Sequence, residues 1–251
     1  MGLQNTSLRR LLTEELTSPV PDDIKPLVNA IRQRHGTAVV AILFYGACLR
    51  SRSLVDGVAD FYVIVDSYEG AYPSPWLVRL NQLLPPNTCY LEVADSSHTL
   101  RAQYAVISVA DFVHAASPRC LQPFVWARFC QPSRLVYVRD SHIQDTIVDA
   151  VHQSLLTMIA RIAPLLPAAD ETRPIAFLDL WLRGLHETYR MELRPKIPGT
   201  IRALYETAPQ RYDRVADETL RELTLQGCYG CGPVPPAGMC RFRRYNDTGY
   251  G

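Results

Sequence analysis

The spacing of apolar residues changes near residue 140 of this chain. Before that point, short apolar runs rich in β-forming residues predict buried strands at 38–45 (AVVAILFY) and 59–65 (ADFYVIV). Weaker runs of the same kind predict strands at 88–93, 103–108 and 134–138. After that point, apolar residues recur every three or four positions, which indicates helices.

Helical spacing also predicts helices in the first half, at 22–34, which stops at Gly36, and at 73–84, which closes on Pro85-Pro86. In the second half it predicts helices at 143–167, 175–191, 199–208 and 215–225. The expected fold class is therefore α/β (α+β). We expect an α/β domain with a mixed sheet at 1–140, a helical domain at 141–226, and a flexible tail rich in Cys, Gly and Pro at 227–251.

Composition excludes several classes of protein. With 251 residues, 47% of them hydrophobic, the chain can bury a full core, so it is neither disordered nor fibrous. The formal net charge is only +1, so no overall field attracts nucleic acid, and we expect no nucleic-acid partner. Any polyanion that binds must be held by a local cluster of positive groups.

No window approaches the roughly 20 apolar residues of a membrane span, and residues 1–16 fit neither a signal peptide nor a transit peptide. Seven cysteines, an odd number, indicate a reducing compartment, either the cytoplasm or an organelle matrix. Cys228, Cys231 and Cys240 are either part of a zinc knuckle, which needs a fourth ligand, or belong to a reduced tail.

One segment carries candidate chemistry for nucleotidyl transfer, a reaction that needs a divalent metal held by carboxylates and backbone N–H donors close to a triphosphate. Gly46 follows the first strand, where the lack of a side chain permits a close approach. Asp60 lies on the second strand and is the candidate metal ligand and catalytic residue. Strand alternation puts Asp66 on the same face but about 20 Å away, so Asp66 is a poor second ligand.

The order of several short motifs resembles the mitochondrial-type phosphatidate cytidylyltransferase family. That family has a Tyr-Gly-Ser-Gly turn and a Leu-Asp-Phe strand ending in Val-Asp, which resemble Tyr45-Gly46-Ala47-Cys48 and the stretch from Ala59 to Asp66. Further similar elements, in the same order, are 103–108 (QYAVIS), 126–132 (WARFCQP), 189–191 (YRM) and 201–205 (IRALY). The similarity covers roughly residues 35–206.

The resemblance implies a polymerase β-type nucleotidyltransferase fold and Mg²⁺-dependent transfer of CMP from CTP to phosphatidic acid, which yields CDP-diacylglycerol. It implies a peripheral position on a membrane, and either phosphatidic acid or another phosphate-bearing acceptor as partner. The nucleotide-binding residues would be Tyr45, Gly46, Ala47, Cys48 and Arg128. Arg190, Arg194 and Lys196, near the end of one helix, would bind phosphate or the acceptor, or would simply be a solvated helix end.

This chain departs from the family pattern at several positions. Ala47 replaces a serine, Cys48 replaces a glycine, and Gln103 and Gln131 replace lysines. The alternatives are therefore a transferase for another small or lipid acceptor, and a catalytically silent nucleotide-binding or interaction module of the same fold. A further carboxylate is also needed, and Asp56, Glu92 and Asp111 are equal candidates for it.

The remaining histidines and tryptophans suggest structural roles. His35, His98, His114, His142 and His152 show no paired spacing, so surface or capping positions are expected for them. Trp76 and Trp181 stand among leucines at helical spacing, which predicts that both pack in the core.

Overall fold

The computed structural model describes residues 6–54, 57–94, 99–166, 175–191, 199–227 and 239–240. The chain forms two compact units. One, the sheet unit, comprises residues 12–119 and 131–150, and the other, the helical unit, comprises 1–11, 120–130 and 151–251. The mixed α/β fold with a helical region after it, which the sequence predicts, is confirmed.

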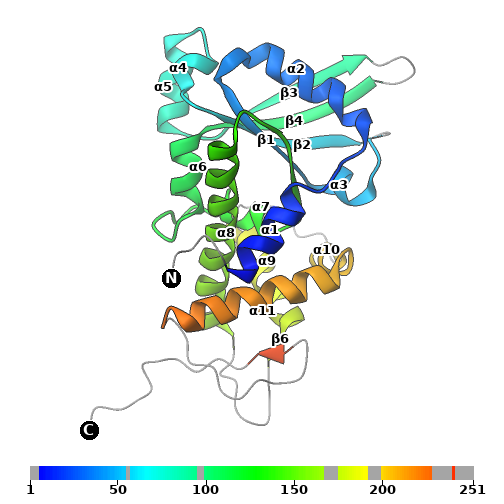
Figure 1. The fold of residues 1–251 in the computed structure, drawn as a ribbon, viewed down its shortest axis with the longest axis vertical. Coiled ribbons are helices and arrows are strands. Elements are labelled where there is room, and N and C mark those ends of the chain that lie inside the picture. Colours follow the sequence, from blue (N-terminus) through cyan, green and yellow to red (C-terminus); the bar gives the residue numbers. More distant parts are fainter. Residues whose placement is uncertain are drawn as a thin grey trace. The chain divides into compact units, whose positions relative to one another are not determined.

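Five strands form the sheet of the sheet unit, in the order β3-β4-β2-β1-β5 (Figure 1). The strands are β1 Val39–Tyr45, β2 Val58–Val65, β3 Asn87–Ala94, β4 Thr99–Ser108 and β5 Ser133–Val138. The β2–β4 pair is parallel and the other three pairs are antiparallel, so the sheet is mixed as expected. Strands β1 and β2 lie in its interior and are almost wholly buried, which explains their continuous apolar sequence.

Helices cover both faces of this sheet. The helices that belong wholly to the unit are α2 Lys25–His35, α3 Ala47–Ser51, α4 Tyr68–Ala71, α5 Pro75–Leu83 and α6 Val109–Ala116, with 3₁₀ turns η2 Asp22–Ile24 and η3 Gly36–Ala38. Helix α2 runs across one face (Figure 1), where Leu27 and Ile31 join Phe44, Phe61 and other strand residues in the core. Helix α6 covers part of the opposite face, where Phe112 contacts Tyr62.

The helical unit is built around contacts among long helices. Its elements are α7 Trp126–Phe129, η4 Ala163–Leu165, α9 Phe177–Met191, α10 Thr200–Glu206, α11 Pro209–Leu225 and the short strands β6 Ile175–Ala176 and β7 Met239–Cys240. Helices α1 Ser7–Leu16 and α8 Ser141–Ile162 each belong partly to both units. Trp181 is fully buried, as predicted, and its indole N–H donates to the carbonyl of Tyr212 at 2.9 Å.

Trp76 does not pack in the core, contrary to the prediction. It lies on α5 with 70% of its surface exposed. The helix turns Leu77 and Val78 toward the core of the sheet unit instead, so Trp76 falls on the solvent side of the same helix. Helical spacing shows that a face is apolar, but it does not show which part of that face is covered.

The surface role expected for the histidines is wrong for two of them. His35 is 5% exposed, and its Nδ1 lies 3.1 Å from the carbonyl of Ala71 and its Nε2 3.2 Å from the hydroxyl of Tyr104. Since a carbonyl only accepts, Nδ1 carries the proton and Nε2 accepts from Tyr104. His152 is also buried, and its Nε2 lies 2.9 Å from the carboxylate of Glu222. Isolated polar residues are buried where the fold supplies such partners.

Among the helices that the structure describes, none has the length and apolar character needed to cross a membrane.

Burial lowers the pKa of His35 below its ordinary 6.5, with a smaller contribution from the charge of Arg34. The unfolded chain therefore takes up a proton at a higher pH than the folded one, and the free energy of unfolding falls as the pH drops below about 6.5. We predict that His35→Phe is less stable at pH 7, because it loses two hydrogen bonds, but flattens this pH dependence. Urea unfolding at pH 7.5 and pH 5.5 tests this, and an unchanged slope with pH would contradict it.

Candidate active site

The candidate site lies where β1 ends against the beginning of β2. Tyr45 pairs directly with Asp60 in the antiparallel register, and Gly46 is the next residue of the chain. A Cβ atom on Gly46 would lie 3.1 Å from Cγ of Asp60 and would overlap its Oδ2. Gly46 also has a φ of +89°, a conformation that side chains disfavour. The Asp60 carboxylate thus lies directly against the backbone of the glycine turn.

Helix α3 starts at this turn (Figure 1), and Gly46 is its N-cap. The amide of Arg50 donates to the carbonyl of Gly46 at 3.3 Å, which closes the first helical turn and leaves the amides of Ala47 and Cys48 outside the helical ladder. A short run of N–H groups beside a glycine is suited to an anion. The carboxylate and these amides together can contact a metal ion and a phosphate.

The Cys48 side chain points away from any such ligand. It is 5% exposed, and its thiol donates to the carbonyl of Val58 at 3.3 Å. Burial, and then the nearby charge of Asp60, raise the pKa of this thiol, so it stays protonated. Cys48 can therefore face a nucleotide with its backbone amide alone.

Besides its strand partner Tyr45, two further neighbours of Asp60 on the same face are also not carboxylates. Tyr62, two residues further along β2, is 1% exposed and its ring lies 5.7 Å from that of Tyr45. Across the parallel ladder, Asp60 pairs with Gln103, and Gln103 pairs in turn with Tyr90. No local pattern in the sequence pointed to Tyr90, because strand register depends on pairing between distant segments.

Asp60 is the carboxylate that lies against the Gly46 turn in the part of the chain that the structure describes. No three His, Cys, Asp or Glu side chains among the described residues come together as a metal site. Mg²⁺ in nucleotide enzymes is commonly bound by one or two carboxylates together with substrate phosphates and water. Asp60 therefore fits a metal ion that arrives with a triphosphate, rather than one held by a protein cage.

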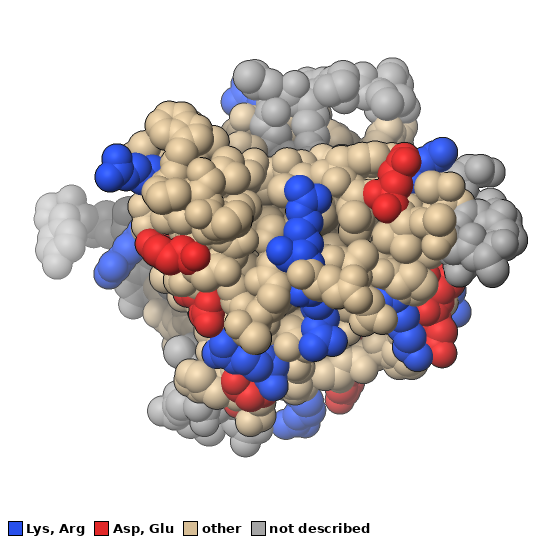
Figure 2. Space-filling view, turned by 90° about the horizontal axis from the view of Figure 1, so that it is seen from above, with Lys and Arg blue, Asp and Glu red and all other residues tan. Residues whose placement is uncertain are grey.

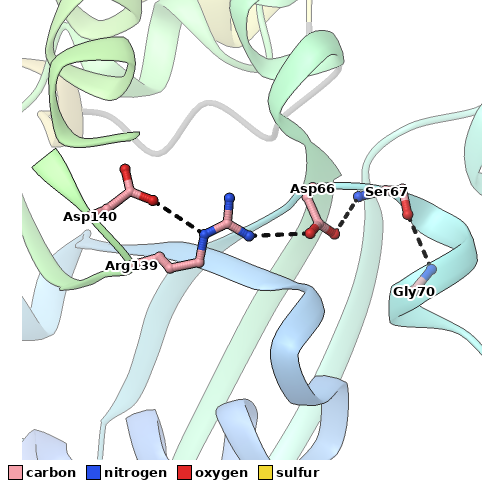
Figure 3. Close-up of polar contacts among 5 residues, drawn as sticks. All are labelled: Asp66, Ser67, Gly70, Arg139 and Asp140. Carbon is pink, nitrogen blue, oxygen red and sulfur yellow. Dashed lines mark hydrogen bonds and ion pairs between the residues drawn. The ribbon is translucent and has the colours of Figure 1, made fainter. Parts of the chain in front are cut away.

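Asp66, at the far end of β2, takes part in a separate structural network (Figure 3). Its carboxylate accepts from the amide of Ser67 at 2.8 Å and from Nη1 of Arg139 at 3.2 Å. Arg139 also contacts Asp140 at 3.3 Å, and Asp140 caps α8 through the amide of Ile143. The network joins the ends of β2 and β5, and six residues of strand separate it from Asp60, about 20 Å.

The three candidates for a further carboxylate differ in position. Glu92 is on the same face as Asp60, but it accepts from the Tyr90 hydroxyl at 2.8 Å and lies 3.5 Å from Nε of Arg101. Asp111 follows the opposite end of β4, where its carboxylate accepts from Tyr68 at 2.7 Å and Ser108 at 2.8 Å. Asp56 lies outside the described residues. Glu92 and Asp111 are thus held by other partners.

The predicted basic residues belong to the helical unit. Arg128 is half-buried on α7. Arg190, on α9, is 69% exposed and its Nε lies 3.1 Å from Glu187, a carboxylate that Arg183 also contacts at 3.3 Å. Arg194 and Lys196 lie outside the described residues.

Charges of both signs are distributed over the surface seen from above in Figure 2. Basic groups run down the middle of this view, acidic groups lie mostly toward its margins, and uncharged residues cover the larger area. This view agrees with the net charge of +1, so the binding of a polyanion would depend on a few local groups.

Comparisons with known proteins add little to this description. No protein-family model and no curated protein sequence matches the chain. Among solved structures, it is similar to a nucleotidyltransferase-like protein from Exiguobacterium sibiricum 255-15, with 12% sequence identity and a TM-score of 0.28. The similarity covers 81% of this chain and 72% of that one, and it is too low to support an argument about function.

The close approach at Gly46 leads to a prediction about stability. We expect Gly46→Ala to destabilise the protein by more than about 1–2 kcal/mol, because it adds overlap with Asp60 to the strain of a positive φ. Gly36→Ala is the matched control, since Gly36 also has a positive φ, of +60°, but has nothing within 4 Å of a Cβ.

The free energy of unfolding in denaturant, measured for the two variants alone and combined with Asp60→Ala, tests whether a side chain at position 46 overlaps the Asp60 carboxylate. The cost of Gly46→Ala should fall toward that of Gly36→Ala once Asp60 is truncated. Equal costs in both backgrounds would show that the two groups do not press against each other.

Proposed function

We propose that this chain is a nucleotidyltransferase that binds a Mg²⁺-nucleoside triphosphate at the corner formed by Gly46 and Asp60. One observation supports the proposal. The Asp60 carboxylate lies against Gly46, which has no side chain, and the backbone amides that follow Gly46 are the first of helix α3. Such a corner can accept a metal ion on one side and phosphate oxygens on the other.

The resemblance to phosphatidate cytidylyltransferases suggests the reaction. A phosphate oxygen of phosphatidic acid attacks the α-phosphorus of CTP, the bond from that phosphorus to the bridging oxygen of the β-phosphate breaks, and pyrophosphate leaves. The products are CDP-diacylglycerol and pyrophosphate. Bound Mg²⁺ would supply charge neutralisation for the triphosphate.

The chain's own groups would position the substrates. Asp60 would hold the metal, and the amides from Gly46 to Cys48 would hold phosphate oxygens without competing side chains. Arg128, Arg190, Arg194 and Lys196 are the proposed contacts for phosphates and the acceptor, because a guanidinium donates two parallel N–H bonds to a phosphate and a lysine ammonium adds a positive charge. An acceptor of this kind lies in a membrane, so peripheral contact with its surface is part of the proposal.

One observation favours a second candidate, a catalytically silent module that binds nucleotides. Two-metal phosphoryl transfer uses several carboxylates around the reacting phosphate. At the same-face positions next to Asp60, this chain has the buried Tyr62 and the amide of Gln103. A site with one carboxylate can still bind a Mg²⁺-nucleotide and yet transfer the nucleotidyl group poorly.

Pyrophosphate release from CTP, Mg²⁺ and vesicles containing phosphatidic acid separates the two candidates. We predict that the wild-type protein releases pyrophosphate and that Asp60→Ala lowers this rate by more than roughly 100-fold. The reason is that losing even an outer-shell partner of a metal costs roughly 10- to 100-fold. Asp66→Asn is the matched control, because it changes the same residue type on the same strand about 20 Å away, and its rate should stay near wild type.

Two other results would revise the proposal. A wild-type rate no higher than that of Asp60→Ala, with CTP still bound, would identify the silent module. Release with ATP or GTP but not with CTP would assign the chain to a transferase for another nucleotide.

A further inference from the structure

The sheet face that carries Asp60 is divided into a covered part and an open part. Near α6, Tyr62 and Ala105 are 1% and 8% exposed. Toward the beginning of β2 and β4 the same face reaches solvent: Val58 is 39% exposed, Tyr90 is 54% exposed, and Gln103 is also exposed. A strip of open sheet therefore extends from Asp60 toward the edge strand β3.

Strand register places three side chains of this strip in one row. Asp60 on β2 pairs with Gln103 on β4, and Gln103 pairs with Tyr90 on β3. Directly paired residues project from the same face, and neighbouring strands are about 5 Å apart, so Tyr90 lies about 10 Å from Asp60 with Gln103 between them. That separation matches the reach from the α-phosphate of a nucleotide across its ribose to its base.

The Tyr90 ring is held in place although it is exposed. Its hydroxyl donates to Glu92 at 2.8 Å, and Glu92 lies 3.5 Å from Nε of Arg101 on the adjacent strand. The hydrogen bond at its hydroxyl restricts the rotamers of an exposed tyrosine, so less side-chain entropy is lost when a ligand stacks on its ring. Such a ring is suited to stacking against a planar ligand.

We propose that Tyr90 and Gln103 form the base-binding part of the nucleotide site, with the ring stacking on the base and the amide hydrogen-bonding to its edge. The inference rests on the proposed function, because the phosphates at Gly46 and Asp60 set the direction in which the base extends. The ligand class is a nucleoside triphosphate, and contacts from Tyr90 and Gln103 would determine which base is preferred.

The chemistry of Gln103 suits a base better than it suits a phosphate. A side-chain amide carries no charge, but it has both a donor and an acceptor, the combination found along the edge of a nucleobase. A positive charge at this position would instead favour a phosphate oxygen. Gln103 is therefore better suited to contact the uncharged base than the charged phosphates.

Isothermal titration calorimetry with Mg²⁺-CTP and Mg²⁺-tripolyphosphate tests the assignment, because tripolyphosphate has the phosphates without the base. Tyr90→Ala should weaken CTP binding by roughly 5- to 100-fold, the usual value of one stacked base, and Tyr90→Phe should lose less affinity than Tyr90→Ala because it keeps the ring but not its hydrogen bond to Glu92. Gln103→Leu should weaken CTP binding by about 2- to 10-fold and reduce discrimination among CTP, UTP, ATP and GTP. None of these variants should alter tripolyphosphate binding.

Gln33→Leu is the matched control for Gln103→Leu, since Gln33 is exposed on α2, which covers the opposite face. Unchanged CTP affinity in Tyr90→Ala and Gln103→Leu, or an equal loss of CTP and tripolyphosphate affinity, would overturn the base-binding assignment and leave the proposed function standing. A wild-type protein that binds neither tripolyphosphate nor any of the four nucleotides would overturn both.

Discussion

The β1–β2 register is the constraint on which the site depends. It pairs Tyr45 with Asp60, so the next residue of β1 must pass directly beside an aspartate side chain. Only glycine fits there, because a Cβ would overlap the carboxylate and the backbone has a positive φ. The turn then enters α3, and the buried Cys48 thiol secures that helix to β2 through Val58. The proposed metal ligand and the proposed phosphate donors therefore come from one corner of the sheet unit.

Much of the sheet could be predicted from local sequence because its interior strands are continuous apolar runs bounded by glycine or charged residues. The alternation along β2 also showed correctly that Asp66 is remote from Asp60. Short helices such as α6 were missed, since eight residues give too little periodicity to separate from neighbouring strands. The burial of His35 and the exposure of Trp76 depend on which distant elements cover them, and no local pattern carries that information.

The candidate site was predictable only in part, for the same reason. Gly46 and Asp60 are close in sequence and are joined by a connection, residues 46–57, that contains α3, so their convergence could be proposed from the pattern. The sequence marks Gln103 only as a position that lacks a positive charge, and no local pattern points to Tyr90. Both belong to the row of Asp60 because β4 pairs with β2 and β3 pairs with β4, and pairing between distant segments is decided by the whole sheet.

The central claim is that a metal-bound triphosphate sits between the Gly46 turn and the Asp60 carboxylate. A crystal structure of the protein with CTP and Mg²⁺ tests it most directly. The account predicts a metal ion coordinated by an Asp60 oxygen and by triphosphate oxygens, with the amides of Ala47 and Cys48 donating to the phosphates. A nucleotide bound elsewhere, or one bound with its metal away from Asp60, would contradict it.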